Sequence, residues 1–332
     1  MNYGLIVIFD EDICYADCLA EYFRTKGCLA SELVVFTKKE SFLDFTEKYP
    51  IDILIINEVF LELLNSISSN NIFILCENRL SVPNTANAHS LYKYSSAEEL
   101  LRQVMSEYTP KASGPCISFK GKGDGKLIGI SSPVGRCGKT SFALSLGLKL
   151  SLKHSCLFIS FDELSSMYFI LGQNTAGKKN LADLLYYFLQ SPRLMDSKLI
   201  STITSFQNLD CISPAVSPGI YNEIALEDWI SFISSLKDLK RYEYIILDFG
   251  TLQPVSHLLK MCQYIFVPGI KDDSYSDKKL SLFMDILESD LSVHKILLPS
   301  VNFSSIGTDY LTSLTSGELG LFTSTIISEF NL

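Results

Sequence analysis

The stretch KLIGISSPVGRCGKTS, residues 126–141, decides the fold of the second half of the chain. Its apolar start predicts a strand, and a helical pattern, KTSFALSLGLKLSLK, begins at Lys139. Between them lies Gly-Lys-Thr, which ends the phosphate-binding pattern G-x-x-x-x-G-K-[ST]. The first glycine of that pattern falls on Pro133, so the loop keeps only the second half of the motif. A loop between a strand end and a helix start is typical of anion-binding sites.

This loop supplies candidates for holding nucleotide phosphates and magnesium. Gly135 and Gly138 permit a tight turn and a close approach of the backbone to a ligand. Lys139 would reach the β- and γ-phosphates, and the Thr140 hydroxyl would ligate magnesium. Ser141 would add a contact near the α-phosphate. The sequence therefore predicts a site for ATP or ADP with Mg²⁺.

Other apolar runs in the second half lead into acidic residues. The run YEYIILDFG, residues 242–250, reaches Asp248, which is typical of the strand beside a phosphate-binding loop, where such an acid orders magnesium. The run CLFISFDEL contains Asp162 after its apolar part. Together with YIFVPGI and KILLP, these runs predict a mainly parallel sheet with helices between its strands.

The first half predicts a second sheet of the same kind. The apolar runs GLIVIF, ELVVF, IDILIIN and NIFILC alternate with helical patterns. The pattern SAEELLRQVMSEY begins with a capping box from Ser96 to Glu99 and closes this half as a helix. Such alternation implies a doubly wound parallel sheet. The predicted fold class is therefore α/β, with two doubly wound domains.

A linker separates the two predicted domains. The chain has 332 residues, which is long for one hydrophobic core. The stretch TPKASGP, residues 109–115, and the KGKGDGK downstream of it are rich in Gly, Pro and Lys and poor in large apolar residues. We therefore expect domains at 1–110 and 126–332, joined by a linker at 111–125.

The distribution of charge argues against nucleic-acid binding. Residues 1–110 carry 8 Lys and Arg against 16 Asp and Glu, a net charge of −8, and residues 111–332 carry 20 against 21. Because Lys and Arg supply most of the affinity for a nucleic-acid backbone, neither half is expected to bind one. No apolar run approaches the roughly 20 residues of a membrane span, and the start of the chain has no signal-peptide pattern. We expect a cytoplasmic protein without direct membrane insertion.

The nine cysteines are scattered and include no C-x-x-C pair, which favours a reducing cytosol over a disulfide framework. Cys14 and Cys18 share a predicted helix face, and the four histidines lie far apart in the sequence. We expect ordinary buried thiols rather than a metal or redox site.

The strand ends of the first half resemble those of a response-regulator receiver domain. Asp10 and Glu11 match the acidic pair that holds magnesium in that family, and Lys93 matches the lysine that ends its fifth strand. The phosphoacceptor aspartate falls on Asn57, whose amide cannot act as the carboxylate nucleophile that phosphoryl transfer requires. The resemblance implies a receiver fold kept as an interaction module, not a phosphorylated switch.

The second half resembles the ParA/MinD group of P-loop ATPases, and within it the TadZ/CpaE proteins of pilus assembly. The loop SPVGRCGKTS is similar to the family's S-P-x-G-G-x-G-K-T, with Arg136 standing where the family has Gly. The segment KYSSAEELL is similar to K-Y-x-S-x-x-E-I, and DYLTSLTSGELGLFTSTII to Y-x-x-x-L-x-x-G-E-x-G-x-[YF]. A receiver that lacks its phosphoacceptor also precedes the ATPase in that family.

Carried over residue by residue, the resemblance implies a role for each of several residues. Lys139, Asp162 and Asp248 would take the catalytic positions, and Thr140 with Asp248 would hold magnesium. The nucleotide would be bound by the loop and by the segment after KILLP, through Gly135, Arg136, Cys137, Gly138, Lys139, Thr140, Ser141, Pro299 and Asn302.

Two departures from the family imply slow hydrolysis. The lysine that reaches across the ParA/MinD dimer to the partner's nucleotide falls on Val134, and the first acid of the D-x-D strand end falls on Ser160. An added cation at the transition state is worth roughly 10³–10⁵ in rate, so its loss favours binding with slow turnover. Arg136, two residues away, is a candidate substitute cation.

The resemblance as a whole implies an ATP-binding homodimer that localises or assembles the secretion machinery of a Flp/Tad (type IV-like) pilus. Recruitment to a pole or to the inner face of the membrane would go through protein partners, because no Lys or Arg follows Lys295 and a basic interfacial helix is therefore absent. Three alternatives remain open: a ParA/MinD-type partitioning or positioning ATPase, a response-regulator-like protein of NtrC layout, and a small-molecule phosphotransferase.

Overall fold

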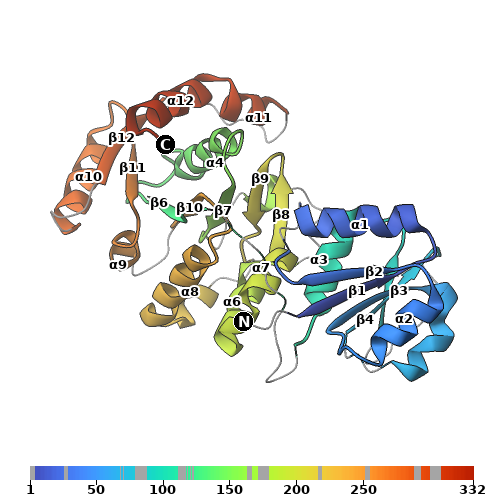
Figure 1. Ribbon diagram of the computed structural model, residues 1–332. Helices are drawn as coiled ribbons and strands as arrows, with labels where there is room; N and C mark the ends of the chain where they lie inside the picture. Colours follow the sequence, from blue (N-terminus) through green and yellow to red (C-terminus); the bar gives the residue numbers. More distant parts are fainter. Residues whose placement is uncertain are drawn as a thin grey trace. The chain divides into compact units, whose positions relative to one another are not determined.

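The chain divides into two compact units, each with its own sheet (Figure 1). The five-stranded unit comprises Met1–Lys120 and Ser191–Ser201, and the seven-stranded unit comprises Gly121–Gln190 and Thr202–Leu332. The computed structural model describes residues 4–25, 29–67, 69, 71–78, 88–110, 117, 119, 121, 123–162, 167–170, 179–215, 219–250, 255–287, 293–299 and 308–332.

The five-stranded unit is a parallel sheet in the order β2-β1-β3-β4-β5, which is one of the common doubly wound orders. Its elements are β1 (Leu5–Phe9), α1 (Ile13–Thr25), β2 (Glu32–Phe36), α2 (Lys39–Thr46), β3 (Ile53–Asn57), the 3₁₀ helix η1 (Glu58–Ser66), β4 (Ile72–Cys76), β5 (Ala88–Tyr92) and α3 (Ala97–Glu107), with η3 (Pro192–Leu194) and α7 (Met195–Thr202) from later in the chain.

Both faces of this sheet are covered, which explains why its strands are apolar at consecutive positions. Successive side chains point to opposite faces, so Ile8 joins the cluster that includes Phe23 of α1, while Phe9 stacks on Phe42 of α2 with ring centroids 4.5 Å apart. The predicted N-cap of α3 is confirmed, because the hydroxyl of Ser96 accepts the N–H of Glu99 at 3.2 Å.

A segment from the second half of the chain completes the five-stranded unit, which the sequence did not reveal. Ile200 of α7 belongs to the core cluster of this unit. Asp196 accepts the N–H of Phe119 at 2.8 Å through its Oδ2. The Lys198 side chain is buried in the same unit. That residues 1–110 fold as a domain of their own therefore stays a prediction. Removing or altering α7 tests it.

The seven-stranded unit is a mainly parallel sheet in the order β12-β11-β6-β10-β7-β9-β8, in which only the β8–β9 pair is antiparallel. Its elements are β6 (Lys126–Ile130), α4 (Lys139–Leu150), β7 (Cys156–Ser160), α5 (Met167–Ile170), α6 (Leu181–Gln190), β8 (Ile203–Phe206), β9 (Leu209–Ile212), η4 (Ile220–Glu223), α8 (Leu226–Asp238), β10 (Tyr244–Asp248), α9 (Val255–Leu259), β11 (Tyr264–Ile270), α10 (Ser274–Ile286), β12 (Val293–Leu298), α11 (Thr308–Thr315) and α12 (Glu318–Phe330).

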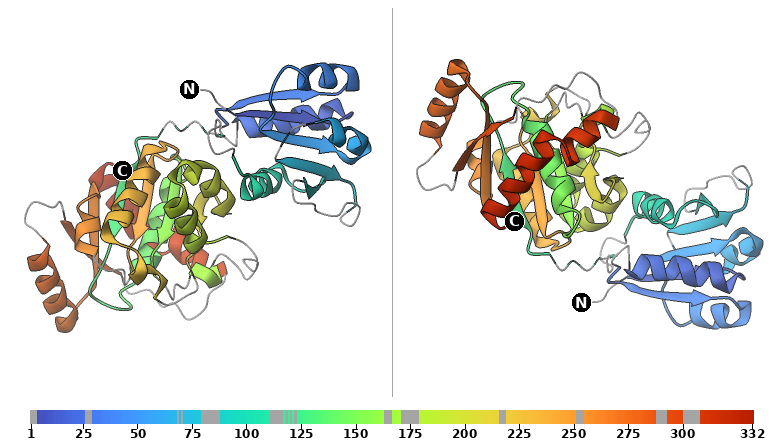
Figure 2. Two further views of the ribbon diagram at one scale, coloured as in Figure 1. Left: turned by 90° about the horizontal axis from the view of Figure 1, so that it is seen from below. Right: turned by 90° about the horizontal axis from the view of Figure 1, so that it is seen from above.

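Helices cover both faces of this sheet as well (Figure 2). On one face α4 packs with α11 and α12 in a single core cluster, where Phe142 meets Phe322 edge to face. On the other face Trp229 of α8 packs edge to face on Phe161 at 5.3 Å. The C-terminal segment thus ends the chain as a pair of helices packed on this face.

The β8–β9 hairpin was not predicted. Each strand has four residues, and β8 has no buried side chain, so neither gives a long apolar signal. The turn between them contains Gln207 in the left-handed region, with φ of 55°. The pairing of β8 with β9 depends on the backbone hydrogen bonds between them, and the pattern of apolar residues in each strand does not reveal it.

The described residues of the predicted linker are packed against the two units. Ile117 is buried in the five-stranded unit. Phe119 of the same unit forms an isolated antiparallel β-bridge with Leu29. In the seven-stranded unit the N–H of Gly123 donates to the carbonyl of Lys240 at 2.7 Å. A Cβ at Gly123 would come within 2.0 Å of the Tyr242 carbonyl oxygen, so only glycine fits this approach.

Candidate functional site

The loop 131–138 joins β6 to α4 at the carboxyl edge of the seven-stranded sheet. Strand β6 is central, because it pairs with β10 on one side and β11 on the other. The hydroxyl of Ser132 donates to the carbonyl of Pro268 on β11 at 2.6 Å and accepts the N–H of Val134 at 3.0 Å. The loop is therefore anchored to the neighbouring strand before it turns into α4.

Two left-handed residues shape the turn. Gly138 precedes α4 with φ of 81°, a conformation that favours glycine. Arg136 has φ of 56°, so the chain keeps a left-handed turn at the position where the resemblance would place glycine. Gly135 is not left-handed, and a Cβ there would meet no atom within 4 Å. Backbone geometry thus requires glycine at 138 but not at 135.

The predicted cation and the predicted magnesium ligands come together at the start of α4. The Lys139 ammonium donates to the carbonyl of Gly250 at 2.8 Å. The Thr140 hydroxyl donates to Oδ2 of Asp248 at 2.7 Å. Asp248 ends β10, opposite Ile130 at the end of β6, and this register places its carboxylate beside the loop.

The strand on the other side of β10 brings Ser160 and Asp162 to the same place. Ser160 pairs with Asp248 in register, and its hydroxyl donates to Asp248 Oδ2 at 3.3 Å. The N–H of Asp162 donates to the Ser160 oxygen at 3.4 Å. Gly250, with φ of 50°, lies against Asp162, where a Cβ would come within 2.7 Å of the Asp162 Cα. All three predicted catalytic residues therefore lie around one point.

Burial controls the electrostatics of Asp248. Its side chain is fully buried, and this burial raises the pKa of the carboxyl above its ordinary value. The positive charge of Lys139 and hydrogen bonds from Thr140 and the Gly250 N–H act in the opposite direction. A buried carboxylate of this kind gains from a bound cation.

The donor set fits a magnesium-bound nucleotide. Carboxylate and hydroxyl oxygens are ligands that Mg²⁺ prefers, and Asp248 and Thr140 supply them within one hydrogen bond of each other. The start of α4, a helix of 12 residues, provides backbone N–H groups for phosphate oxygens, with the Lys139 ammonium beside them. The open space above Gly135 leaves the backbone accessible there.

The other predicted nucleotide ligands have different surroundings. Ser141 lies in the first turn of α4, and its hydroxyl is 3.1 Å from the Tyr310 hydroxyl. Cys137 is buried, so it would contribute its backbone rather than its thiol. Pro299 directly follows β12, and Asn302 lies outside the described residues.

Sequence reasoning did not identify the polar contacts between α4 and the C-terminal helices. Besides the Ser141–Tyr310 pair, the hydroxyl of Ser145 donates to the carbonyl of Leu314 at 2.6 Å and lies 2.9 Å from the Thr323 hydroxyl. The available signal was the spacing of Ser141 and Ser145, one turn apart on a helix whose other residues from Phe142 to Leu148 are apolar or glycine.

A second polar cluster lies at the carboxyl edge of the five-stranded sheet. Asp10 accepts three hydrogen bonds: Oδ1 from the Asp12 N–H at 2.9 Å and the Lys93 ammonium at 3.1 Å, and Oδ2 from Asn57 at 2.9 Å. The Lys93 ammonium also forms an ion pair with Oδ2 at 2.8 Å. Asn57 also accepts the N–H of Val59 at 3.0 Å. Asp10, Asn57 and Lys93 are buried. Asp10, Asn57 and Lys93, three of the receiver-like positions, thus form one hydrogen-bonded group.

Tyr15 packs against this cluster, whereas Glu11 lies outside it. The Tyr15 hydroxyl donates to the Lys93 carbonyl at 2.8 Å, and the Lys93 ammonium lies 4.7 Å from the centre of the Tyr15 ring. Burial, together with the charge of Asp10, raises the pKa of Tyr15. Glu11 is exposed, so the two acids of the predicted magnesium pair do not share one environment.

The cysteines depart in part from expectation. Cys14 and Cys18 of α1 are exposed, because they lie on the outer face of a helix whose inner face carries Leu19 and Phe23. The expectation of buried thiols is wrong for these two and is confirmed for Cys76, Cys137, Cys156 and Cys211. Among the described residues no three or more His, Cys, Asp or Glu side chains gather as a metal site.

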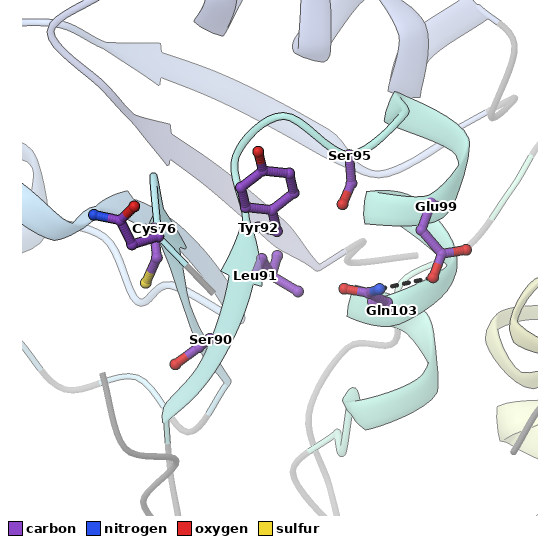
Figure 3. A pocket seen from close by; sticks show the side chains of 8 residues that line it. Cys76, Ser90, Leu91, Tyr92, Ser95, Glu99 and Gln103 are labelled. Atoms are coloured by element: carbon purple, nitrogen blue, oxygen red, sulfur yellow. Dashed lines mark hydrogen bonds between the residues drawn. The ribbon is translucent and has the colours of Figure 1, made fainter. Parts of the chain in front are cut away.

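A cavity of about 420 Å³ lies in the five-stranded unit, beside β5 and α3 (Figure 3). Its one carboxylate, Glu99, already accepts hydrogen bonds from Gln103 at 2.7 Å and from the Arg102 side chain. The cavity therefore offers no unmatched charge, and we assign it no ligand. The lining residues are Cys76, Asn78, Ser90, Leu91, Tyr92, Ser95, Glu99 and Gln103.

None of the helices in the described part of the chain is both long and apolar enough to cross a membrane.

Comparison with known proteins gives structural similarities only. No protein-family model matches the chain, and no curated protein sequence matches it. A plasmid partition protein from Borrelia burgdorferi is similar with a TM-score of 0.47 and 19% identity, covering 62% of this chain and 98% of that chain. A ParA family ATPase from Chlorobium tepidum gives 0.45 and 21%, covering 60% and 93%.

A cobyrinic acid a,c-diamide synthase from Mycobacterium smegmatis, with bound ATP analog and magnesium, gives a TM-score of 0.44 and 13% identity, covering 62% of this chain and 96% of that chain. At these scores and identities the similarities assign neither a family nor a function.

Proposed function

We propose that the chain binds ATP or ADP with Mg²⁺ at the loop 131–141 and hydrolyses ATP slowly. One observation carries this proposal: Lys139, Thr140 and Asp248 meet at the start of α4, where an ammonium, a hydroxyl and a buried carboxylate lie within hydrogen-bonding reach of neighbouring atoms. This combination suits a phosphate chain and its cation.

Each residue has a separate part in the proposed site. Thr140 and Asp248 would hold the magnesium ion, which neutralises phosphate charge when bound. The Lys139 ammonium would exchange the Gly250 carbonyl for β- and γ-phosphate oxygens. Backbone N–H groups from Gly135 to Ser141 would donate to the remaining phosphate oxygens, and Asp162 would orient the attacking water.

Slow hydrolysis follows from what surrounds that site. Val134 is only 7% exposed and packs as an apolar wall where a cation would help the transition state. Ser160 offers a hydroxyl that already donates to Asp248, and a hydroxyl cannot take a proton from water as a carboxylate can. Arg136 is exposed and has a left-handed backbone. Its guanidinium would be the candidate substitute for the missing cation, at the site of a second copy of the chain.

Replacing Val134 by lysine tests the missing cation. The long apolar stem of lysine can leave the buried position and bring its ammonium to the loop. We expect Val134→Lys to raise the ATP hydrolysis rate by about tenfold or more, measured as phosphate release at saturating Mg-ATP. Val134→Met, of similar bulk and no charge, serves as the control. An unchanged rate in both variants would assign the deficit to Ser160.

Nucleotide binding itself is tested by titration calorimetry with Mg-ATP. Lys139→Ala should weaken binding by roughly 100-fold because a charge-assisted contact is lost, whereas Lys149→Ala, at the other end of the same helix, should leave binding unchanged. Light scattering with and without Mg-ATP measures the proposed nucleotide-stabilised homodimer. Equal affinity and equal mass for wild type and Lys139→Ala would refute the proposal.

We further infer that this dimer serves in assembling the secretion machinery of a Flp/Tad pilus, with recruitment to a pole or to the inner face of the membrane through protein partners. The support is the likeness of the loop, of the segment around Lys93 and of the C-terminal segment to TadZ/CpaE motifs. A partitioning or positioning ATPase is the competing function, and it calls for a lysine at Val134 and a basic surface.

Deletion of the gene in its host distinguishes the two functions. Loss of surface pili, restored by the wild-type gene and not by a Lys139→Ala copy, supports pilus assembly. Normal piliation with a defect in plasmid or chromosome segregation would instead support the partitioning function.

A further inference from the structure

Exposed apolar side chains of the five-stranded unit concentrate at one edge of its sheet. Among the described residues of this unit, four large apolar side chains count as exposed: Ile13 at 57%, Tyr49 at 53%, Val59 at 61% and Tyr94 at 62%. Ile13 follows β1, Val59 follows β3 and Tyr94 follows β5. Since the strands are parallel, these three lie at the carboxyl edge, whereas Tyr49 precedes β3 at the opposite edge.

Acidic side chains surround the three apolar ones. Glu11 and Asp12 precede Ile13, and Glu77 follows β4; all three acids are exposed. Contacts link the strand ends into one surface, because the Glu58 carboxylate accepts the Glu77 N–H at 2.8 Å and joins the end of β3 to the end of β4. The charge of Glu77, together with a hydrogen bond to it, raises the pKa of Tyr94.

The buried polar residues beneath this edge, which form its floor, are bonded to one another. The carboxylate of Asp10 accepts hydrogen bonds from Lys93, Asn57 and Asp12, and its Oδ2 also forms an ion pair with the Lys93 ammonium at 2.8 Å. Asn57 supplies an N–H donor where a carboxylate would repel Asp10. A rigid, internally neutralised floor therefore supports Ile13, Val59 and Tyr94, and the edge presents a surface rather than an ion-binding pocket.

From these features we infer that the carboxyl edge, defined by Ile13, Val59, Tyr94, Glu11, Asp12 and Glu77, is a docking surface for a protein segment that carries Lys or Arg beside two or three apolar side chains. The apolar side chains of the partner would cover Tyr94 and its neighbours, and its cations would lie against the acids.

Charge selects this occupant over the others. Residues 1–110 have 8 basic against 16 acidic residues, so a nucleic acid or an anionic lipid surface is repelled. A second copy of the same edge would oppose acid with acid, and like-charge juxtaposition disfavours that pairing. An acidic surface that carries exposed Tyr, Val and Ile side chains is complementary to a basic amphipathic segment.

A peptide-display selection on the full-length chain tests the inference. The library contains random 15-residue peptides without charge bias, and the enriched peptides are synthesised with a fluorophore for anisotropy titrations. The edge variants are Tyr94→Ser with Val59→Ser, and separately Asp12→Asn with Glu77→Gln. The matched controls are Tyr49→Ser and, on the exposed part of α2, Glu40→Gln with Asp44→Asn.

We expect enriched peptides to be basic and amphipathic, to bind the edge variants about tenfold or more weakly than the wild type, to bind the controls equally well, and to lose affinity with salt. Enrichment of acidic or neutral peptides, or equal binding to edge variants and controls, would overturn the inference. Binding of the same peptides to Lys139→Ala should be unchanged, so the failure of this inference and the failure of nucleotide binding are distinguishable.

Discussion

At the scale of single residues, the carboxylate proposed to hold magnesium, Asp248, also affects the stability of the nucleotide-free protein. Burial raises its pKa in the folded state above the ordinary 3.8. A raised pKa means that the folded protein holds the proton more tightly. This contribution is therefore favourable below pH 3.8 and is lost as the pH rises through the folded-state pKa. At neutral pH the buried charge lowers the free energy of unfolding.

Asp248→Asn should accordingly raise the free energy of unfolding at neutral pH by about 1 kcal/mol, because the amide keeps the hydrogen bond from Thr140 without a buried charge. Urea titrations at neutral and acid pH measure the difference, which should shrink as the pH falls. The same variant should lose most of its magnesium-dependent nucleotide affinity. If Asp248→Asn instead has a lower free energy of unfolding than the wild type at neutral pH, the charge of Lys139 fully compensates the buried Asp248 carboxylate.

Two neighbouring residues of the loop should respond in opposite ways. Arg136 has φ of 56°, so Arg136→Gly removes left-handed strain and should raise the free energy of unfolding by up to about 1 kcal/mol. Gly135→Ala meets no atom within 4 Å and should leave stability unchanged or slightly higher, while it weakens Mg-ATP binding by crowding the phosphates. Thermal unfolding and calorimetric titration of both variants check this. Unweakened binding by Gly135→Ala would mean that phosphates do not approach residue 135.

At the scale of elements, α4 is held by polar contacts to the C-terminal helices as well as by apolar packing. The Ser141 and Tyr310 hydroxyls lie 3.1 Å apart in a buried environment, and burial raises the pKa of Tyr310. If Ser141 contacts the α-phosphate as proposed, Tyr310 would act as a positioning residue for the Ser141 hydroxyl.

A double-mutant cycle measures this coupling. Tyr310→Phe and Ser141→Ala should each weaken Mg-ATP binding, and the double variant should be weaker than wild type by less than the sum, with a coupling of about 0.5–1.5 kcal/mol. Tyr264→Phe, a tyrosine of the same unit that borders the same core cluster, is the control and should not change affinity. Additive effects would mean that the two hydroxyls act independently on the nucleotide.

Strands with a continuous apolar run could be predicted from the sequence, and short strands of mixed polarity could not. The runs of β1, β3, β6 and β10 are apolar at consecutive positions because helices cover both faces of each sheet, and this pattern is local. Strand β8 is half exposed and short, so it lacks that signal. Helix α7 was not predicted, and its membership of the five-stranded unit depends on contacts between distant segments.

The same division applies to the candidate site. Lys139, Thr140 and Asp248 were predictable, because a strand end followed by Gly-Lys-Thr and an apolar run ending in Asp are local patterns whose strands happen to be neighbours. The left-handed conformation of Arg136 was not predictable, because a non-glycine residue gives no sign of a positive φ. Tyr310 was recognised only as part of a motif, and its contact with Ser141 spans 169 residues.

At the scale of the whole molecule, the five-stranded unit depends on a segment that the chain supplies much later. Lys198 of α7 is 4% exposed, and its ammonium donates to the carbonyls of Met105, Ser106 and Tyr108 at 3.2, 2.8 and 2.9 Å. These are carbonyls at the C-terminal end of α3, where a cation stabilises both the unpaired acceptors and the helix dipole.

Lys198→Met keeps most of the apolar stem and removes the donor, so it should lower the free energy of unfolding by about 2–4 kcal/mol. Lys48→Ala, at an exposed position of the same unit after α2, should change it by less than about 0.5 kcal/mol. Urea titrations monitored by tyrosine fluorescence measure both. A fragment of residues 1–120 should unfold at lower urea than the same unit in the full chain, and adding a peptide of residues 191–202 should restore part of the loss. If the fragment is as stable as the full chain and Lys198→Met is neutral, the predicted domain of residues 1–110 folds by itself and α7 only rests on it.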